Sequence, residues 1–191
     1  QRMFQLHGDS KYIDVLEKIL YNGLISGVGL DGKSFFYTNA MQIKNSFKST
    51  DIEAERSGWF TCSCCPTNLT RLLPSVPGYM YAQKDNSLYV NLFINSNATV
   101  MFGDKAVDIV QQNNYPWDGN MKFIISPQKG PMKFLLKIRM PGWSMNEAIP
   151  SDLYSYSDMG SVGFIVKVNG TIIDHDIEKG YAIVGGTWKK G

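Results

Sequence analysis

The chain has 191 residues, 43% of them hydrophobic and 19% charged, which suits one globular domain or one domain plus part of another. Its formal net charge is +2 and its lysines are dispersed, so it lacks the concentrated basic stripe that is typical of nucleic-acid-binding proteins. No stretch approaches the roughly 18 uninterrupted apolar residues of a membrane-spanning helix. Neither a nucleic-acid partner nor a membrane segment is therefore expected.

The first 25 residues predict two helices. Residues 2–6 resemble the end of a helix that Gly8 closes, and Asp9 or Ser10 can cap the next helix. That second helix is expected to run to about residue 25, because its apolar residues recur at spacings of three and four. The residues of this apolar stripe are Ile13, Leu16, Leu20 and Leu24. A helical pair of this kind is what the edge of a helical barrel should look like.

The three cysteines, Cys62, Cys64 and Cys65, lie within four positions, directly before a short predicted helix at 66–73. Pro66 suits the first helical position, where its missing N–H costs nothing. Cys64 and Cys65 would then lie at the positive end of the helix, where backbone amides favour an anion and the pKa of a thiol should fall. A thiolate is both a zinc ligand and a nucleophile.

Two other interpretations of the cysteines were weighed against this one. Free cysteine often packs as a small hydrophobic residue, but three of them next to a helix start fit that explanation less well. A disulfide framework fits worse still, because an odd number of crowded cysteines cannot join distant parts of a chain. Zinc needs about four ligands, so a zinc site would need further ligands from elsewhere.

From Gly78 onward the pattern becomes strand-like, and the domain boundary is expected near Pro77-Gly78 without a long linker. Apolar residues alternate over 88–95 and 133–140. The dipeptide Asn169-Gly170 is a strong signal for a two-residue hairpin. Short strands separated by turn residues predict an antiparallel sandwich, and residues 146–160 predict an exposed excursion.

Motifs along almost the whole chain resemble glycoside hydrolase family 127, whose founding activity is β-L-arabinofuranosidase. The most specific of them surrounds the cysteines and reads Arg56-x-x-Trp59-x-x-Cys62-x-Cys64-Cys65-Pro66-x-Asn68-x-x-Arg71. Others are Leu16-Glu17-Lys18-Ile19-Leu20-Tyr21-Asn22-Gly23, Phe35-Phe36-Tyr37-x-Asn39, Pro141-Gly142-Trp143 and Gly180-Tyr181.

The resemblance implies a mainly β chain with an N-terminal helical part. Residues 1–77 would form the C-terminal part of an (α/α)6 catalytic barrel of the six-hairpin glycosidase type, and residues 78–191 a β-sandwich truncated at its C-terminus. The chain is then an internal fragment. Its partner would be the missing barrel portion of its own chain, which in the family carries a Glu-x-Cys pair of zinc ligands and the acid/base glutamate.

For the intact protein, the resemblance implies a retaining glycosidase that releases L-arabinofuranose or a related sugar from plant-type glycans. Cys64 would be the nucleophile, and Cys64 and Cys65 would bind zinc. Cys62 matches a more variable position and is not assigned as a ligand. Thr67 stands where many relatives carry a second proline, which leaves the subfamily open. The fragment alone is expected to be inactive and to bind zinc weakly.

Two further residues are candidates for binding the carbohydrate substrate. Glu17 lies on the polar side of its helix, where a solvated position is the ordinary interpretation, but the resemblance places a carboxylate there near the sugar pocket. Tyr37 would ordinarily be a core or strand aromatic residue, whereas the resemblance lets its hydroxyl face the substrate or the nucleophile. Arg56 and Trp59 are close enough to shape the surroundings of the cysteines by stacking or packing.

A second hypothesis belongs to another class of protein. The chain could be a non-catalytic β-sandwich module that binds carbohydrate or supports a neighbouring domain, with the cysteines in a structural metal site. The aromatic content of 13% suits sugar stacking and a β core equally well. His7 and His175 lack a partner at metal-ligand spacing and are interpreted as structural or solvent-facing residues. No feature of the sequence indicates a localisation.

Overall fold

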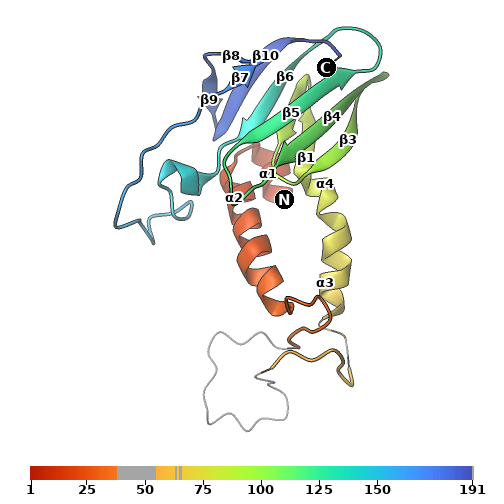
Figure 1. Cartoon of the computed structure of the whole chain (residues 1–191), viewed down its shortest axis with the longest axis vertical. Helices are drawn as coiled ribbons and strands as arrows, with labels where there is room; N and C mark the ends of the chain where they lie inside the picture. Colours follow the sequence, from red (N-terminus) through yellow and green to blue (C-terminus); the bar gives the residue numbers. More distant parts are fainter. Residues whose placement is uncertain (38–54, 63, 65, 191) are drawn as a thin grey trace. The chain divides into compact units, whose positions relative to one another are not determined.

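The computed structural model describes residues 1–37, 55–62, 64 and 66–190 (Figure 1). The chain divides into two compact units. One unit combines Gln1–Val15 with Gly78–Gly191, and the other consists of Leu16–Pro77. Within the described ranges, no helix is both long enough and apolar enough to cross a membrane.

Both helices expected at the start of the chain are present. Helix α1 (Arg2–His7) ends at Gly8, whose left-handed backbone (φ 62°) lets its N–H donate to the carbonyl of Phe4. Helix α2 (Lys11–Lys18) follows, and the Asp9 carboxylate accepts a hydrogen bond from its first N–H at 3.1 Å.

The helical run that starts with α2 changes type before it ends. After Lys18 it continues as a π-helical segment, Ile19–Leu24, and as a 3-10 turn, Ile25–Gly27. The predicted end near residue 25 is therefore close to the observed one. The wider π turn was not indicated by the 3.6-residue period.

The helix predicted at 66–73 is observed as α3 (Thr67–Leu72), with Pro66 at the N-cap rather than at the first helical position. A 3-10 turn, Leu73–Ser75, and the short helix α4 (Pro77–Met80) complete the helical part. The chain turns into strands directly after Met80.

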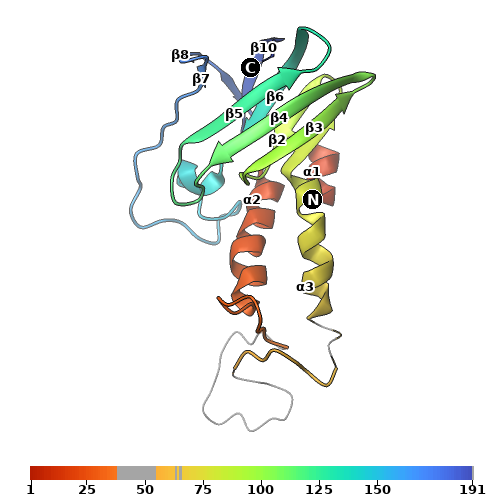
Figure 2. The ribbon, with the colours of Figure 1, turned by 45° about the vertical axis from the view of Figure 1, so that its right-hand side comes forward.

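The rest of the chain is mainly β-sheet. A five-stranded sheet has the order β1-β2-β6-β10-β9, and a three-stranded sheet, which lies in front of it in Figure 2, has the order β3-β4-β5. The strands are β1 (Tyr81–Lys84), β2 (Ser87–Val90), β3 (Ser96–Phe102), β4 (Lys105–Asn113), β5 (Met121–Pro127), β6 (Met132–Arg139), β7 (Lys167–Val168), β8 (Thr171–Ile172), β9 (Asp176–Glu178) and β10 (Tyr181–Trp188).

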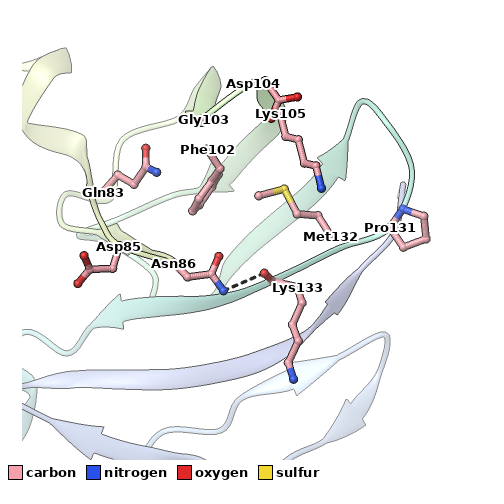
Figure 3. Close-up of a pocket in the computed structure, with 10 residues that line it drawn as sticks. All are labelled: Gln83, Asp85, Asn86, Phe102, Gly103, Asp104, Lys105, Pro131, Met132 and Lys133. Carbon is pink, nitrogen blue, oxygen red and sulfur yellow. Dashed lines mark hydrogen bonds between the residues drawn. The ribbon is translucent and has the colours of Figure 1, made fainter.

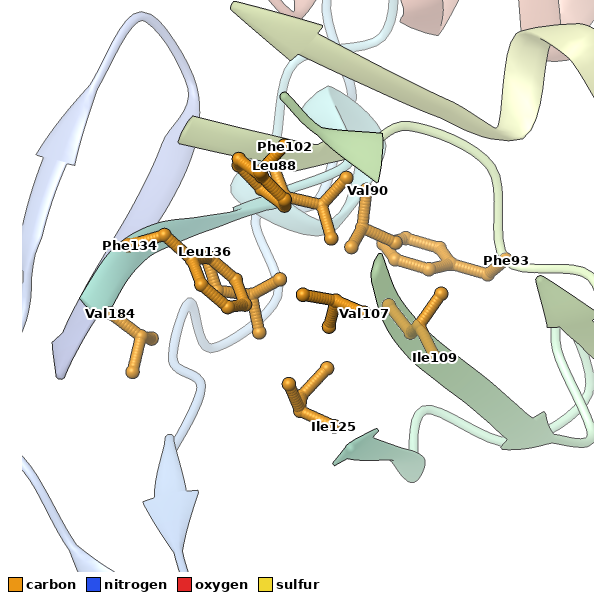
Figure 4. Close-up of a cluster of buried hydrophobic side chains, with 10 residues drawn as sticks. All are labelled: Leu88, Val90, Phe93, Phe102, Val107, Ile109, Ile125, Phe134, Leu136 and Val184. Carbon is orange, nitrogen blue, oxygen red and sulfur yellow. The ribbon is translucent and has the colours of Figure 1, made fainter. Parts of the chain in front are cut away.

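The two larger sheets share one hydrophobic core (Figure 4). The five-stranded sheet contributes Leu88, Val90, Phe134, Leu136 and Val184. The three-stranded sheet contributes Phe102, Val107, Ile109 and Ile125, and Phe93 joins the cluster from the segment between β2 and β3. Each sheet therefore buries its apolar face against the other, as alternating strands require.

Two details of the predicted antiparallel arrangement are wrong. Strand β2 runs parallel to β6, because the three strands between them in the sequence form a crossover that brings the chain back in the same direction. The strand predicted at 88–95 also stops at Val90. Residues 91–93 are all buried, so the alternation there does not separate a core face from a solvent face.

The predictions for the C-terminal third are confirmed. Asn169 and Gly170, with φ angles of 51° and 84°, form the two-residue turn between β7 and β8. Residues 146–160 contain neither helix nor strand, and 151–160 are exposed.

A buried polar cluster joins the N-terminal segment to the sheets. Arg139, only 1% exposed, forms an ion pair with Asp14 and donates from Nε to the carbonyl of Asn91 at 2.6 Å. The hydroxyl of Tyr181 donates to Oδ1 of Asn91 at 2.7 Å, and burial raises the pKa of Tyr181 well above its ordinary value. Arg139 belongs to the polar set of its strand pattern, yet it lies inside because Asp14 supplies the opposite charge.

Candidate catalytic cysteine site

The loop formed by residues 29–34, which precedes Tyr37, is closed by a backbone hydrogen bond between its first and last residues. The N–H of Gly29 donates to the carbonyl of Ser34 at 2.7 Å, and a Cβ at Gly29 would lie only 2.3 Å from Oγ of Ser34. Inside the turn, the N–H of Lys33 donates to the Asp31 carboxylate, which holds the pKa of Asp31 below its ordinary value. This turn fixes the direction in which the chain enters the Phe35-Phe36-Tyr37 segment.

Phe35 connects this segment to the residues ahead of the cysteines. Its backbone exchanges two hydrogen bonds of 3.0 Å with Ser57, and it also bridges to Val28. The Arg56 guanidinium lies 4.5 Å above the ring of Phe36 and donates to the carbonyl of Ser26 at 2.7 Å. Arg56 therefore shapes the site by stacking on the loop, which is one of the two roles that the sequence left open.

Tyr37 and Cys64 meet although 27 positions separate them in the chain. The Tyr37 hydroxyl lies 3.1 Å from Sγ of Cys64, and either atom can be the donor. Phe60, which is buried, packs against both Phe35 and Tyr37 with ring centroids 5.4 Å apart in each pair. This packing orients the hydroxyl. When the thiol is ionised, the hydroxyl can donate to the thiolate and stabilise it.

Cys64 lies three positions before the first residue of α3. Its carbonyl accepts a hydrogen bond of 2.8 Å from Oγ1 of Thr67, the first residue of that helix. The side chains of Cys62 and Cys64 are both exposed, so neither packs as a buried hydrophobic residue. Exposure and a hydroxyl partner are features of a reactive thiol rather than of an inert one. The prediction that Cys65 binds zinc concerns a residue outside the described ranges.

Glu17 is buried, with 5% of its surface exposed. The interpretation of Glu17 as part of a solvated helix face is therefore wrong, because Glu17 shares the buried stripe of the helical run with Ile13 and Leu20. Its role in binding substrate stays a prediction. Trp59 is 77% exposed, so its ring is accessible rather than packed.

A zinc site is not complete within the described part of the chain. No group of three or more His, Cys, Asp and Glu side chains comes close enough there to hold a metal ion. The thiol of Cys64 is a suitable donor, but one thiol next to a tyrosine hydroxyl does not make the four-ligand set that zinc prefers. The described residues therefore fit zinc only in combination with other ligands.

Two residues that support this site were not identified from the sequence. Phe60 orients Tyr37, and Thr67 binds the backbone of Cys64. Both occupy variable positions inside the cysteine motif, Phe60 directly after Trp59 and Thr67 directly after Pro66. Their place in the motif alone does not say which ring or hydroxyl turns toward the cysteine.

Family models match both parts of the chain. The beta-L-arabinofuranosidase GH127 catalytic domain matches residues 1–78, and the beta-L-arabinofuranosidase GH127 middle domain matches residues 87–191. The chain belongs to the GH127 family. The resemblance seen in the motifs is thereby confirmed.

Individual GH127 relatives agree with this assignment. The non-reducing end beta-L-arabinofuranosidase of Bifidobacterium longum subsp. longum is 36% identical over 152 residues, covering 75% of this chain and 23% of that protein. The solved structure of the GH127 beta-arabinofuranosidase BT3674 matches all of this chain with a TM-score of 0.88 and 44% identity. The beta-L-arabinofuranosidase Ara127N-Se from Geobacillus stearothermophilus T6 matches all of it with a TM-score of 0.80 and 37% identity.

The GH127 chain spans only part of the length of these relatives. It covers 23% of the Bifidobacterium protein and 28% of each of the two solved chains. The similarity therefore concerns a part of the catalytic domain and the middle domain of a GH127 protein.

Proposed function

We propose that these residues belong to a retaining glycoside hydrolase that removes L-arabinofuranose, or a closely related sugar, from a glycan. The observation that carries the proposal is the contact between the Tyr37 hydroxyl and Sγ of Cys64 at 3.1 Å. A nucleophilic thiolate needs a partner that stabilises its charge and fixes its direction, and a tyrosine hydroxyl held by aromatic packing supplies both. The GH127 family assignment supplies the substrate class.

In the proposed reaction, the thiolate of Cys64 attacks the anomeric carbon and displaces the glycosidic oxygen. The departing oxygen takes a proton from a general acid, which we assign to a glutamate of the family's catalytic barrel. The resulting thioglycosyl intermediate is then attacked by water, which gives a proton back to the same glutamate, and the thiolate leaves with its electron pair. Two displacements at one carbon retain its configuration.

The described residues have separate roles in this scheme. Tyr37 donates to the thiolate in the free enzyme and again when the thiolate is released. Thr67 holds the backbone of Cys64 at the start of α3. We propose Glu17 as a binding group for sugar hydroxyls, because a buried carboxylate can accept hydrogen bonds from them at a fixed position.

We further propose that Cys64 and Cys65 bind zinc together with ligands from the family's catalytic barrel. Zinc, when bound, would keep the thiols ionised near neutral pH. For the architecture, we propose that residues 1–77 complete an (α/α)6 barrel and that residues 78–191 form a β-sandwich. The shared core between the two larger sheets supports the second assignment.

The test replaces Cys64 in a protein that carries, besides these 191 residues, the segments that complete the length of its relatives. Cys64→Ser should lower kcat on a β-L-arabinofuranoside by at least about a thousandfold, because serine is nearly isosteric but far harder to ionise. Its melting temperature should change little. Cys62→Ser is the matched control, since it removes a second exposed thiol of the same motif, and it should keep most of the activity.

Two further measurements complete the test. Cys65→Ser should lose activity mainly through weaker zinc binding, with partial recovery at high zinc concentration. A mechanism-based inhibitor that alkylates through the anomeric carbon, followed by peptide mapping, should label Cys64. A label on a carboxylate, or full activity of Cys64→Ser, would overturn the cysteine mechanism. Absence of any glycosidase activity in the completed protein would favour the non-catalytic module.

A further inference from the structure

A pocket of about 540 Å³ opens between the two larger sheets, at the end where three turns meet (Figure 3). Its wall is formed by the β1–β2 turn with Asp85 and Asn86, the β3–β4 turn with Gly103 and Asp104, and the start of β6. The volume lies within the range of pockets that bind small molecules, roughly 300–1,000 Å³. All lining residues belong to one compact unit, so the pocket exists within that unit alone.

The walls of the pocket are fixed by the fold. Asn86 donates from Nδ2 to the carbonyl of Lys133 at 3.0 Å, and its own carbonyl accepts from the N–H of Leu135 at 3.0 Å. Asp85 and Gly103 have left-handed backbones, with φ angles of 52° and 62°, which makes both turns tight. A site whose walls are already in place loses little conformational entropy when a ligand binds.

The floor of the pocket is apolar and is anchored in the core. Phe102 packs on Phe134 with ring centroids 4.9 Å apart, and Phe134 packs in turn on Trp188 at 5.5 Å. Figure 3 shows Phe102 and Met132 between the side chains of Gln83 on one side and Lys105 on the other, while Lys133 points away. The apolar side chains of Phe102 and Met132 therefore lie next to two polar groups. These are the amide of Gln83 and the ammonium group of Lys105.

The rim is polar and carries charges of both signs. Two carboxylates, Asp85 and Asp104, accompany the ammonium group of Lys105, whereas the side chain of Lys133 points away. A phosphate or another strong anion would meet both carboxylates, and a purely apolar ligand would strip water from amide and charged groups without replacing it. A neutral sugar avoids both costs, because its hydroxyls donate and accept while its C–H groups pack on an apolar floor.

We propose that this pocket is a second carbohydrate-binding site, which takes one or two sugar units of a neutral, arabinofuranose-containing glycan. The choice of sugar rests on the proposed function, whereas the site itself rests on the pocket and its residues. It shares no residue with the Tyr37–Cys64 site. Its effect would be to hold a long glycan on the protein, which raises the local concentration of substrate.

The binding test uses the 191-residue chain and needs no turnover. A short oligosaccharide of L-arabinofuranose is titrated while the amide signals of Gln83, Asn86 and Gly103 are followed by nuclear magnetic resonance. These signals should shift with saturation, and Gln83→Ala/Lys105→Ala should weaken binding about tenfold or more. Both replaced side chains are exposed, so the melting temperature should stay within a few degrees.

The matched control is Gln112→Ala/Lys122→Ala, which removes the same two residue types from a cross-strand pair on β4 and β5, where both side chains are exposed. It should bind like the unaltered chain. Equal weakening in both double variants, absence of shifts at millimolar sugar, or equally strong shifts with inorganic phosphate would each overturn the proposal.

A kinetic measurement separates this site from the proposed function. In the completed protein, Gln83→Ala/Lys105→Ala should raise KM for a long glycan that ends in β-linked L-arabinofuranose severalfold and leave kcat/KM for a small β-L-arabinofuranoside unchanged. If the completed protein hydrolyses neither substrate but the chain still binds the oligosaccharide in this pocket, the proposed catalysis fails and the pocket proposal stands. If the completed protein hydrolyses both substrates but the oligosaccharide does not bind in this pocket, the pocket proposal fails and the proposed catalysis stands.

Discussion

Individual residues at the candidate site show how a loop and the segment before a helix bring Tyr37 and Cys64 together. Tyr37 reaches Cys64 because Phe60 supports its ring and because the backbone of Phe35 is joined to Ser57. The ring of Tyr37 makes the contact with Phe60, whereas its hydroxyl makes the contact with Sγ of Cys64. Its contact with Sγ is therefore the property to remove in an experiment.

Tyr37→Phe should make Cys64 slower to react at neutral pH. A hydrogen bond to a charged group contributes about 1.5–3 kcal/mol. Its loss should move the midpoint of the alkylation rate against pH upward by about one to two pH units. The measurement is iodoacetamide labelling of the 191-residue chain at several pH values, with peptide mass mapping to separate Cys64 from the other thiols.

Tyr154→Phe is the control for this measurement, because Tyr154 is 69% exposed and lies in the irregular excursion. It should leave the profile of Cys64 unchanged. An unchanged profile in Tyr37→Phe would mean that the hydroxyl does not donate to the thiolate in solution.

At Gly180, both the backbone conformation and the lack of space disfavour any side chain. Its φ angle is +73°, and a Cβ there would lie 1.9 Å from Oγ and 2.8 Å from Cβ of Ser10. Gly180→Ala should therefore lose about 1–2 kcal/mol through the left-handed backbone and about 1–3 kcal/mol more through the clash. Urea unfolding of the 191-residue chain measures the loss.

Gly170→Ala provides the comparison, since Gly170 also has a left-handed backbone (φ +84°) but open space around its Cβ position. It should show the backbone cost alone. Equal losses for the two variants would show that the segment around Ser10 moves away without cost.

Among the helices and strands, the N-terminal segment belongs structurally with the sheets that follow 60 residues later. Phe4 of α1 packs against Tyr89 of β2 and Tyr181 of β10. Arg139 at the end of β6 pairs with Asp14 in α2. The sheet thus has a covered face that the strand pattern by itself would leave to solvent, which explains why Tyr89 and Arg139 are buried.

Removing one partner of this buried ion pair should be costly. Asp14→Asn or Arg139→Met should each lower the free energy of unfolding by about 3–5 kcal/mol, because a buried charge remains without its counter-charge. Denaturant unfolding of the chain measures this loss of unfolding free energy. The double variant Asp14→Leu/Arg139→Met should recover part of the loss, since replacing both charges by apolar groups avoids the unpaired charge. A double variant no better than the sum of the single changes would contradict this account.

For the molecule as a whole, the chain carries the middle domain of a GH127 protein together with one region of its catalytic domain. Cys64, which we propose as the nucleophile, lies in that catalytic region, in the unit Leu16–Pro77. The pocket proposed to bind sugar lies in the other unit, among the strands. Catalysis and glycan retention would then depend on residues that can be altered separately.

The 191-residue chain alone should bind zinc weakly. It supplies Cys64 and Cys65 of the expected ligand set, whereas zinc prefers four ligands. Metal analysis of the purified chain after mild chelation should find much less than one zinc per chain. One tightly held zinc per chain would show that these residues complete a site by themselves.

The sequence by itself determined the parts of the protein that depend on local chemistry. The helix end at Gly8, the Asn169-Gly170 turn and the short helix after Cys64 follow from backbone preferences of nearby residues, and each is present. The cysteine motif likewise identified the family before any contact was known. Repeating apolar residues indicated most strands, because a strand in a two-layer structure must bury one face.

Only the tertiary structure decided which distant residues meet. Nothing local to Arg139 says that Asp14, 125 positions away, neutralises its charge, and nothing local to Tyr37 says that its hydroxyl faces Cys64. The tertiary structure likewise decided that β2 pairs in parallel with β6 and that residues 91–93 are buried. Periodicity reports which faces of an element are apolar, whereas the partner of each face is set by the packing of the whole chain.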